Sequence, residues 1–240
     1  MTARVGLIIP SSNRMVEQEM VQAFPAGVHP LVTRLRMTGP NRMGLDQLLP
    51  RVGEATEALV DAKCEVVAFH CTANSTEGGV DGEQRILGAM ASAPRATTTA
   101  TDIRRALDAL GARRIVLITP YSQQVTDHEA EFFHEAGYEV VHAKGYGLAG
   151  SDAYCATPST FWKERVIEAE RADADVYFAS CANISVFGVI EEIEARLDKP
   201  VITSNQAVIW DALSRLGWSD RTGCPGRLFA RSGIAEPADV

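Results

Sequence analysis

The sequence lacks any apolar run approaching about twenty residues, the length that a helix needs to cross a bilayer, so we expect no transmembrane helix. It is also poor in positive charge, with 23 lysines and arginines against 31 aspartates and glutamates and a formal net charge of -8. A nucleic-acid-binding surface normally carries a basic patch, so this balance argues against nucleic acid as a partner. A small anionic substrate stays open, because a pocket can be locally positive in an acidic protein.

Cysteine is sparse and shows no metal-site spacing. The five cysteines include no CxxC pair and no zinc-ligand cluster, so we expect no metal. The start, Met-Thr-Ala-Arg, runs directly into an apolar segment without a signal-peptide pattern, from which we expect a cytoplasmic protein with reduced thiols. The GxxxxGK[ST] phosphate loop and the GxSxG motif of serine hydrolases are missing too, although Gly78 and Gly79 are adjacent.

The sequence does contain a repeated pattern of residues. The apolar run Val66–Phe69 is followed by His70, Cys71 and a short series of small polar residues, and the segment 175–185 repeats this order around Cys181. Cys181 lies 110 residues after Cys71 (181 − 71), and Pro120, which ends another apolar run, lies 110 residues after Pro10 (120 − 10). Matched landmarks in the same order indicate an internal duplication.

Apolar runs alternate with helical patterns through both repeats, which predicts an α/β fold with mostly parallel sheets. We expect two pseudo-symmetric Rossmann-like halves, residues 1–98 plus 206–240 and residues 99–205, with the active site in the cleft between them. The pattern predicts helices that include 50–62, 83–91 and 102–110. It predicts loops over 74–82 and 145–159, and a tail from residue 218 without periodicity.

The two matched cysteines are the best candidates for chemistry. A cysteine at the carboxyl end of a parallel strand lies where open α/β sheets bind ligands. Buried cysteine is usually inert, and we interpret Cys64, Cys155 and Cys224 in that way. Cys71 and Cys181 differ because they are matched and because helix starts are expected after both, whose N–H groups would lower the thiol pKa.

Three polar residues in the turns allow two interpretations each. Asn13 is either the N-cap of the next helix or an amide donor to a substrate carboxylate. Tyr121 is either a partly buried turn tyrosine or a phenol donor, and Asn205 is either a cap or a ligand. His70 is expected to point away from Cys71 and to be a satisfied buried histidine, since adjacent strand residues face opposite sides. The acidic residues of the helices are interpreted as solvated faces.

The segment Ile9-Pro10-Ser11-Ser12-Asn13, together with the paired cysteines, resembles the maleate cis-trans isomerases and their relatives, the arylmalonate decarboxylases, within the aspartate/glutamate racemase superfamily. The resemblance runs from Val5 to about Arg227. It implies an enzyme without a cofactor, in which Cys71 attacks an alkene carbon and Cys181 handles the proton, while Asn13 and Tyr121 bind the substrate. Arylmalonate decarboxylases keep only the second cysteine, so Cys71 argues against a strict decarboxylase.

We therefore expect a cofactor-independent cis-trans isomerase of maleate or a related cis-enedioate, forming a homo-oligomer. Asn205 and the residues that follow the two cysteines, Thr72 and Ala182, are expected to help bind the substrate. The alternatives are a decarboxylase, a racemase, or a cysteine-dependent hydrolase of a small dicarboxylate, amide or cyclic imide. The polar residues Asn74, Ser75 and Glu77 after Cys71 could bind such substrates, which is why these alternatives remain. A small-molecule binding module without a reactive thiol is the non-enzymatic alternative.

Overall fold

The computed structural model describes residues 2–39 and 43–231, and it contains two four-stranded parallel sheets with the same strand order. The first sheet has the order β2 (Val28–Leu35), β1 (Ala3–Pro10), β3 (Val66–Phe69) and β4 (Ala96–Thr98). The second has the order β6 (Glu139–Gly145), β5 (Arg114–Thr119), β7 (Val176–Ala179) and β8 (Val201–Thr203). Each strand of one half therefore has a counterpart in the other, which confirms the two pseudo-symmetric α/β halves.

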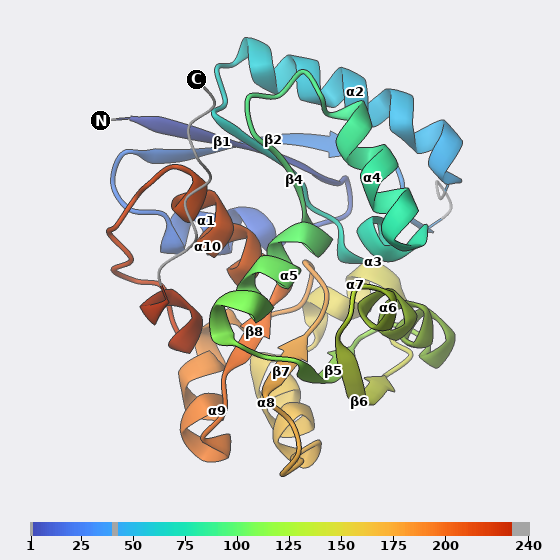
Figure 1. The fold of residues 1–240 in the computed structure, drawn as a ribbon, viewed down its shortest axis with the longest axis vertical. Coiled ribbons are helices and arrows are strands. Elements are labelled where there is room, and N and C mark those ends of the chain that lie inside the picture. Colours follow the sequence, from blue (N-terminus) through green and yellow to red (C-terminus); the bar gives the residue numbers. More distant parts are fainter. Residues whose placement is uncertain (1, 40–42, 232–240) are drawn as a thin grey trace.

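Helices connect the strands and cover the sheets. Before β5 along the chain these are α1 (Val16–Ala23), α2 (Leu45–Asp61), α3 (Thr72–Thr76), α4 (Gly79–Ala89) and α5 (Thr99–Leu110). After β5 they are α6 (Gln123–Glu135), α7 (Gly150–Ala156), α8 (Ser159–Glu168), the 3₁₀ turn η2 (Phe187–Val189), α9 (Ile190–Leu197) and α10 (Ser204–Arg215), followed by the 3₁₀ turn η3 (Arg227–Ala230). Helices α5 and α10 lie between the two sheets (Figure 1).

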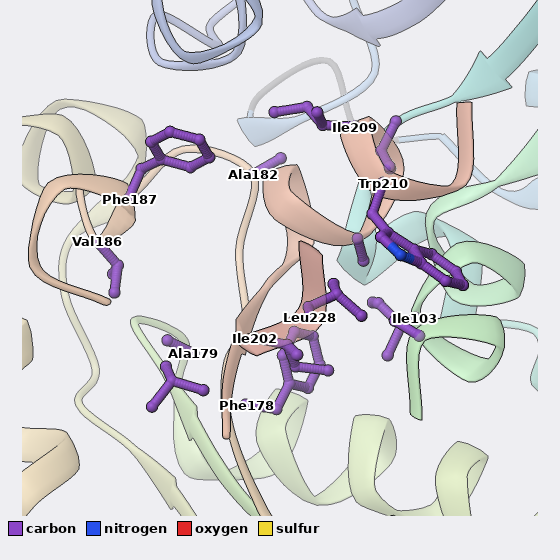
Figure 2. Packing of buried hydrophobic residues seen from close by; sticks show 14 of the residues in the cluster. Ile103, Phe178, Ala179, Ala182, Val186, Phe187, Ile202, Ile209, Trp210 and Leu228 are labelled. Atoms are coloured by element: carbon purple, nitrogen blue, oxygen red, sulfur yellow. The ribbon is translucent and has the colours of Figure 1, made fainter. Parts of the chain in front are cut away.

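The central strands are apolar because both faces of each sheet are covered. All residues of β3 and β7 are buried. Around α5 and α10 one core joins the halves, and Figure 2 shows Ile103 of α5 beside Ile202 of β8 and Leu228 of η3. Burial of each such side chain stabilises the fold by about 1.5–3 kcal/mol. A second cluster, which includes Ile8 and Phe69, fills the outer face of the first sheet under α2 and α4.

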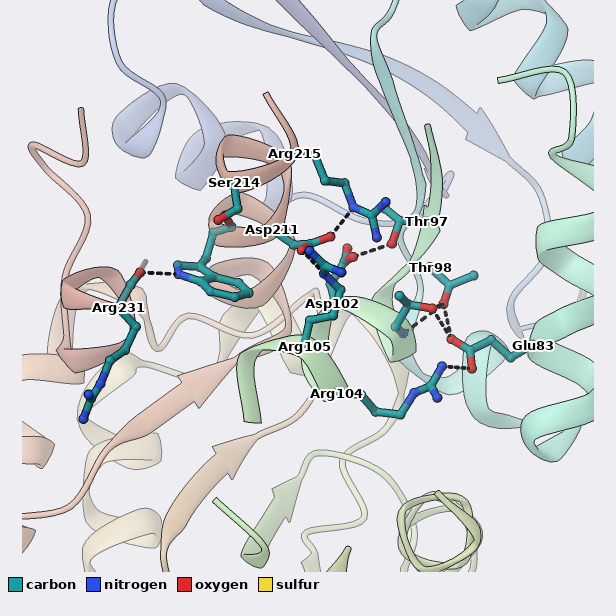
Figure 3. Close-up of polar contacts among 12 residues, drawn as sticks. Glu83, Thr97, Thr98, Asp102, Arg104, Arg105, Asp211, Ser214, Arg215 and Arg231 are labelled. Carbon is teal, nitrogen blue, oxygen red and sulfur yellow. Dashed lines mark hydrogen bonds and ion pairs between the residues drawn. The ribbon is translucent and has the colours of Figure 1, made fainter. Parts of the chain in front are cut away.

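A buried polar cluster lies where α5 meets α10 (Figure 3). Asp102 and Asp211 are fully buried, and Asp211 accepts hydrogen bonds from Arg105 and Arg215. Burial raises the pKa of Asp102 well above its ordinary value, and the neighbouring Asp211 carboxylate raises it further. Asp102 therefore keeps its proton to a higher pH than an exposed aspartate does.

The prediction that a helix begins near Pro50 was wrong, because α2 begins at Leu45 and contains Pro50. Proline has no N–H, so the carbonyl of Asp46 loses its usual partner four residues on. Pro50 and Asp46 are both exposed, which places this position on the solvent side of the helix. The apolar stripe that includes Leu48 and Val52 is buried and holds the helix together.

The predicted loops over 74–82 and 145–159 were also wrong in part. The first contains the end of α3 and the start of α4, with Gly79 at a φ of 64° between them. The second contains α7, none of whose residues is fully buried, so it leaves no apolar stripe in the sequence. Cys155 therefore lies on a helix. The tail from residue 218 contains η3, and residues 232–240 of the predicted first half lie outside the described residues.

Helix α10, near the end of the described chain, packs against both α1 and α5. The division into residues 1–98 plus 206–240 and residues 99–205 stays a prediction. Within residues 2–39 and 43–231, the structure shows no helix that is both long and apolar enough to span a membrane.

Candidate active site

A cavity of about 700 Å³ opens where the carboxyl ends of the strands of both halves face each other. Parallel strands meet there with their connecting turns, so side chains distant in the sequence come together. Six of the seven residues predicted for the site line this cavity: Cys71, Cys181, Asn13, Tyr121, Thr72 and Ala182. The central expectation that both cysteines share one cleft is thus met by the geometry, although their roles stay a prediction.

Cys71 lies between β3 and α3 and is 7% exposed. Its thiol donates a hydrogen bond of 3.0 Å to Oδ1 of Asn74, one turn further along α3. The Asn74 amide in turn donates to the Glu77 carboxylate at 3.4 Å. Burial raises the pKa of the Cys71 thiol to about 12, and the nearby negative charge of Glu77 adds to this.

Cys181 follows β7 with a backbone φ of 143°, a region that residues with a side chain rarely occupy. Its N–H donates to Oγ of Ser204 at 3.1 Å, and the N–H of Asn183 donates to its sulfur at 3.4 Å. Backbone strain of this kind costs about 1–3 kcal/mol and persists only where the surroundings fix the chain. The strained turn presents the sulfur to the cavity.

The prediction of a lowered thiol pKa at both cysteines was wrong. Burial raises the pKa of Cys181 to about 12, although hydrogen bonds from Tyr121 and from the Asn183 backbone lower it in part. Helix α3 after Cys71 has only five residues, and a turn follows Cys181, with the next helical residue at Phe187. The helix-terminus effect is therefore weak at Cys71 and missing at Cys181, so desolvation decides and both thiols hold their protons at neutral pH.

Asn13 has a structural role that also positions it in the cavity wall. Its Oδ1 accepts hydrogen bonds from the N–H groups of Met15 and Val16 at 3.0 and 3.1 Å, which is a capping arrangement. Its Nδ2 donates to the carbonyl of Ala182 at 2.8 Å. Asn13 thus ties the turn after β1 to the turn that contains Cys181, and it keeps a second amide hydrogen for a ligand.

Tyr121 follows β5 and is 8% exposed. Its ring packs edge-on against that of Tyr154 on α7, with the ring centroids 5.9 Å apart. Burial raises the pKa of its hydroxyl well above the ordinary value, and the Cys181 and Glu129 charges add to this. Tyr121 therefore stays protonated and can act as a hydrogen-bond donor beside Cys181.

Asn205, the seventh predicted residue, lies beneath the cavity and not among the residues that line it. Its Oδ1 pairs with Nε2 of His70 at 2.8 Å, and its Nδ2 donates to the Glu19 carboxylate at 2.6 Å. His70 is fully buried, its Nδ1 pairs with the Thr99 hydroxyl at 2.9 Å, and burial lowers its pKa to about 4. The expected satisfied buried histidine is confirmed.

Two residues of the site region escaped the sequence analysis. Ser204 is fully buried and accepts hydrogen bonds from both the Thr72 hydroxyl and the Cys181 N–H. Glu129 of α6 is 1% exposed and accepts a hydrogen bond from Ser180. The interpretation of the helix acids as solvated faces was therefore wrong for Glu129, as it was for Glu19 and Asp102. Ser204 is adjacent to Asn205, which the sequence indicated as a candidate, whereas nothing in the sequence indicated Glu129.

The described residues of the cavity lining include neither lysine nor arginine. The titratable side chains among them include Glu77, Asp152, which forms an ion pair of 2.7 Å with Arg14, and His128, which pairs with Glu131. A bound carboxylate would thus be held by neutral donors, namely hydroxyl, amide and backbone N–H groups. No group of three or more His, Cys, Asp or Glu side chains in the described ranges is arranged to hold a metal ion.

Known proteins are similar to this chain over almost its whole length. The protein-family model described as arylmalonate decarboxylase matches residues 5–229. An arylmalonate decarboxylase of Bordetella bronchiseptica is 27% identical over 237 residues, covering 96% of this chain and 98% of that protein. A maleate isomerase of Nocardia farcinica is 25% identical over 244 residues, covering 94% and 95%.

Solved structures are similar as well. A double mutant of arylmalonate decarboxylase in its liganded form superposes with a TM-score of 0.84 at 26% identity, covering 95% of this chain and 99% of that one. A maleate isomerase of Pseudomonas putida S16 crystallised with maleate gives a TM-score of 0.84 at 21% identity, covering 97% and 99%. The second likeness is one of fold alone.

Proposed function

This chain belongs to the arylmalonate decarboxylase family, and on that premise we propose that it is a cofactor-independent cis-trans isomerase of maleate or a related cis-enedioate. The observation that carries the proposal is the position of Cys71 and Cys181 in the wall of one cavity, with Tyr121 beside them. A binding module would need neither thiol. Maleate isomerases and an arylmalonate decarboxylase both occur among the relatives, and the presence of Cys71 favours isomerisation.

Isomerisation requires the carbon–carbon double bond to become single for a time. In the proposed reaction the sulfur–hydrogen bond of Cys71 breaks first, and its proton passes to a nearby carboxylate. The thiolate adds to one alkene carbon, a carbon–sulfur bond forms, and the π electron pair moves toward the neighbouring carboxylate as an enediolate. Rotation about the resulting single bond follows. The electron pair then returns, the carbon–sulfur bond breaks, the trans alkene leaves with the same atoms that entered, and Cys71 takes back its proton. Cys181, as a thiol, steadies the carbanion or lends it a proton during rotation.

The developing enediolate needs fixed donors, because its charge forms in a cavity with no lysine or arginine among the described lining residues. The Tyr121 hydroxyl, the remaining Asn13 amide hydrogen and the backbone N–H groups of Thr72 and Ala182 are suitable. Fixed dipoles of this kind cost no reorganisation during the reaction, and each is worth about a hundredfold to a thousandfold in turnover. Asn205 contributes indirectly in this proposal, through its 3.4 Å hydrogen bond to the Ala182 carbonyl.

Decarboxylation is the second candidate, favoured by the family model and by the 27% identical relative. In that reaction Cys181 alone would protonate an enediolate formed by loss of carbon dioxide, and Cys71 would be dispensable. The dependence on Cys71 therefore separates the two candidates.

The test is proton NMR of the purified protein with maleate, an arylmalonate and maleamate in parallel. Fumarate formed from maleate supports the isomerase. Loss of carbon dioxide from the arylmalonate supports the decarboxylase, and ammonia from maleamate supports a hydrolase. If all three compounds stay unchanged while one of them binds, the binding-module alternative becomes the better account.

A further inference from the structure

A buried carboxyl group lies next to the turn that carries Cys181. Glu129 is 1% exposed, and its Oε1 accepts a hydrogen bond from the hydroxyl of Ser180, the residue directly before Cys181. Its Oε2 is buried and has no hydrogen-bond partner among the described residues. A buried carboxylate oxygen without a partner is costly, so its presence at a reactive site calls for a reason.

Glu129 does not line the cavity, but its contact with Ser180 places it next to the turn that carries Cys181. Burial is the main cause that raises the pKa of Cys71, Cys181 and Tyr121, and the negative charge of Glu129 raises all three further. The effect on the pKa is mutual, because a negative charge on the sulfur of either cysteine disfavours a negative charge on the Glu129 carboxyl group. In a region shielded from water, two such charges interact far more strongly than they would at the surface.

The other charged groups around α6 have different partners or are exposed. On α4 these are Asp81, Glu83, which pairs with Arg104, and Arg85, which pairs with Asp46. On β5 and β6 they are Arg114, which pairs with Asp173 and Glu139, the half-buried His142, and Lys144, which lies over the Tyr146 ring. Glu77, directly after α3, is exposed. On α6 itself His128 pairs with Glu131, and Glu135 accepts from the Val80 N–H. Burial raises the pKa of Glu129 to about 7, while the Ser180 hydrogen bond lowers it in part.

We propose that Glu129 is a positioning residue for the cysteine chemistry proposed above, and that its carboxyl group holds a proton whenever a cysteine of the cavity is ionised. In this exchange the sulfur–hydrogen bond of one cysteine breaks and an oxygen–hydrogen bond forms at Oε2 of Glu129. The region keeps a single negative charge throughout, and nothing is oxidised or reduced. The charge of Glu129 and the charge of a cysteine therefore exclude each other, and Glu129 sets the pH range in which a thiolate forms.

The experiment measures thiol ionisation without any substrate. The intact protein is alkylated with iodoacetamide between pH 5 and pH 10, and the rates at Cys71 and at Cys181 are read separately from their peptides by mass spectrometry. In Glu129→Gln, which keeps the shape and the Ser180 hydrogen bond but removes the charge, both profiles should move to lower pH. Each unit of movement raises the rate below the midpoint about tenfold.

Glu19→Gln is the matched control, since Glu19 is also buried, has a pKa raised by burial to about 7, and accepts a hydrogen bond from a neutral side chain, Asn205. Its thiol profiles should match those of the wild type. Ser180→Ala is the second variant. It removes the hydrogen bond that favours the Glu129 carboxylate, so the profiles should move in the same direction by a smaller amount, and it carries the test if Glu129→Gln does not fold.

Unmoved profiles in a folded Glu129→Gln protein, or an equal movement in Glu19→Gln, would overturn the proposal. The result is separate from the fate of the isomerase proposal. Moved profiles in a protein that leaves maleate unchanged would support the role of Glu129 and contradict the substrate. Turnover of maleate with unmoved profiles would do the reverse.

Discussion

The hydroxyl of Thr72 donates a hydrogen bond of 2.8 Å to the hydroxyl of Ser204 across the interface between the halves. Thr72 follows Cys71, and the same Ser204 oxygen accepts the N–H of Cys181. One buried oxygen thus links the two turns that carry the cysteines. This link also holds the strained backbone of Cys181, whose φ is 143°.

Ser204→Ala is expected to destabilise the protein by about 1–3 kcal/mol, because two buried donors lose their acceptor. Turnover should fall as well, since the Cys181 turn is no longer fixed. Urea unfolding together with a maleate assay measures both effects. Exposed Ser92 supplies the control: Ser92→Ala should change neither. Wild-type stability in Ser204→Ala would show that the link does not hold the turns.

Cys71→Ala is expected to abolish the isomerisation of maleate, because it removes the nucleophile of the proposed addition. Cys181→Ser should keep a trace of activity, since a hydroxyl can still donate a proton. Cys224 does not line the cavity, and Cys224→Ser should retain wild-type turnover. Proton NMR of fumarate formation measures all three. Wild-type turnover in Cys71→Ala would rule out the covalent mechanism.

Tyr121→Phe is expected to lower kcat about a hundredfold to a thousandfold, because one donor to the developing charge is lost. The pKa of Cys181 should also rise, since the Tyr121 hydrogen bond lowers it in the wild type. Steady-state kinetics and the alkylation profile of Cys181 measure the two effects. Tyr146 packs on Trp162 away from the cavity lining, so Tyr146→Phe is the control for removal of a phenol oxygen. An unchanged kcat in Tyr121→Phe would remove this residue from the mechanism.

Asp102→Asn is expected to flatten the dependence of stability on pH. The pKa of Asp102 is raised in the folded protein, so the folded state binds this proton more tightly than the unfolded state does. The associated stability is fully present below the ordinary pKa of about 4, and it is lost as the pH rises toward the folded pKa. Asparagine keeps the shape of the neutral carboxyl group and has no proton to lose.

Urea unfolding at pH 5, 7 and 9 compares the two proteins. The fall in the free energy of unfolding with pH should be smaller in Asp102→Asn. The part that remains comes from other groups whose pKa values burial also raises, among them Glu19, Glu129 and Glu194. Asp61 is exposed, and Asp61→Asn should follow the wild-type curve. If the free energy of unfolding falls equally with pH in wild type and in Asp102→Asn, the pKa of Asp102, shown beside Asp211 in Figure 3, is not raised in the folded protein.

The long-range plan of the protein was available in the sequence because it depends on local and periodic features. The apolar runs before Cys71 and Cys181 and the 110-residue offset between them predicted two parallel sheets and a shared cavity. The ends of helices were less accurate. Helix α2 begins before Pro50 because tertiary burial of Leu48 and Val52 outweighs one lost backbone hydrogen bond.

The pKa values of the site residues could not be predicted from the sequence, because a pKa depends on burial and on neighbours that only folding brings together. Local reasoning from helix starts predicted acidic thiols at Cys71 and Cys181, whereas desolvation raises the pKa of both to about 12. Glu129 resembles any other helix acid until α6 packs behind Ser180. The sequence by itself determined which side chains meet at the strand ends, and the tertiary structure alone decided which of them are charged there, since the cost of charge is set by exclusion of water.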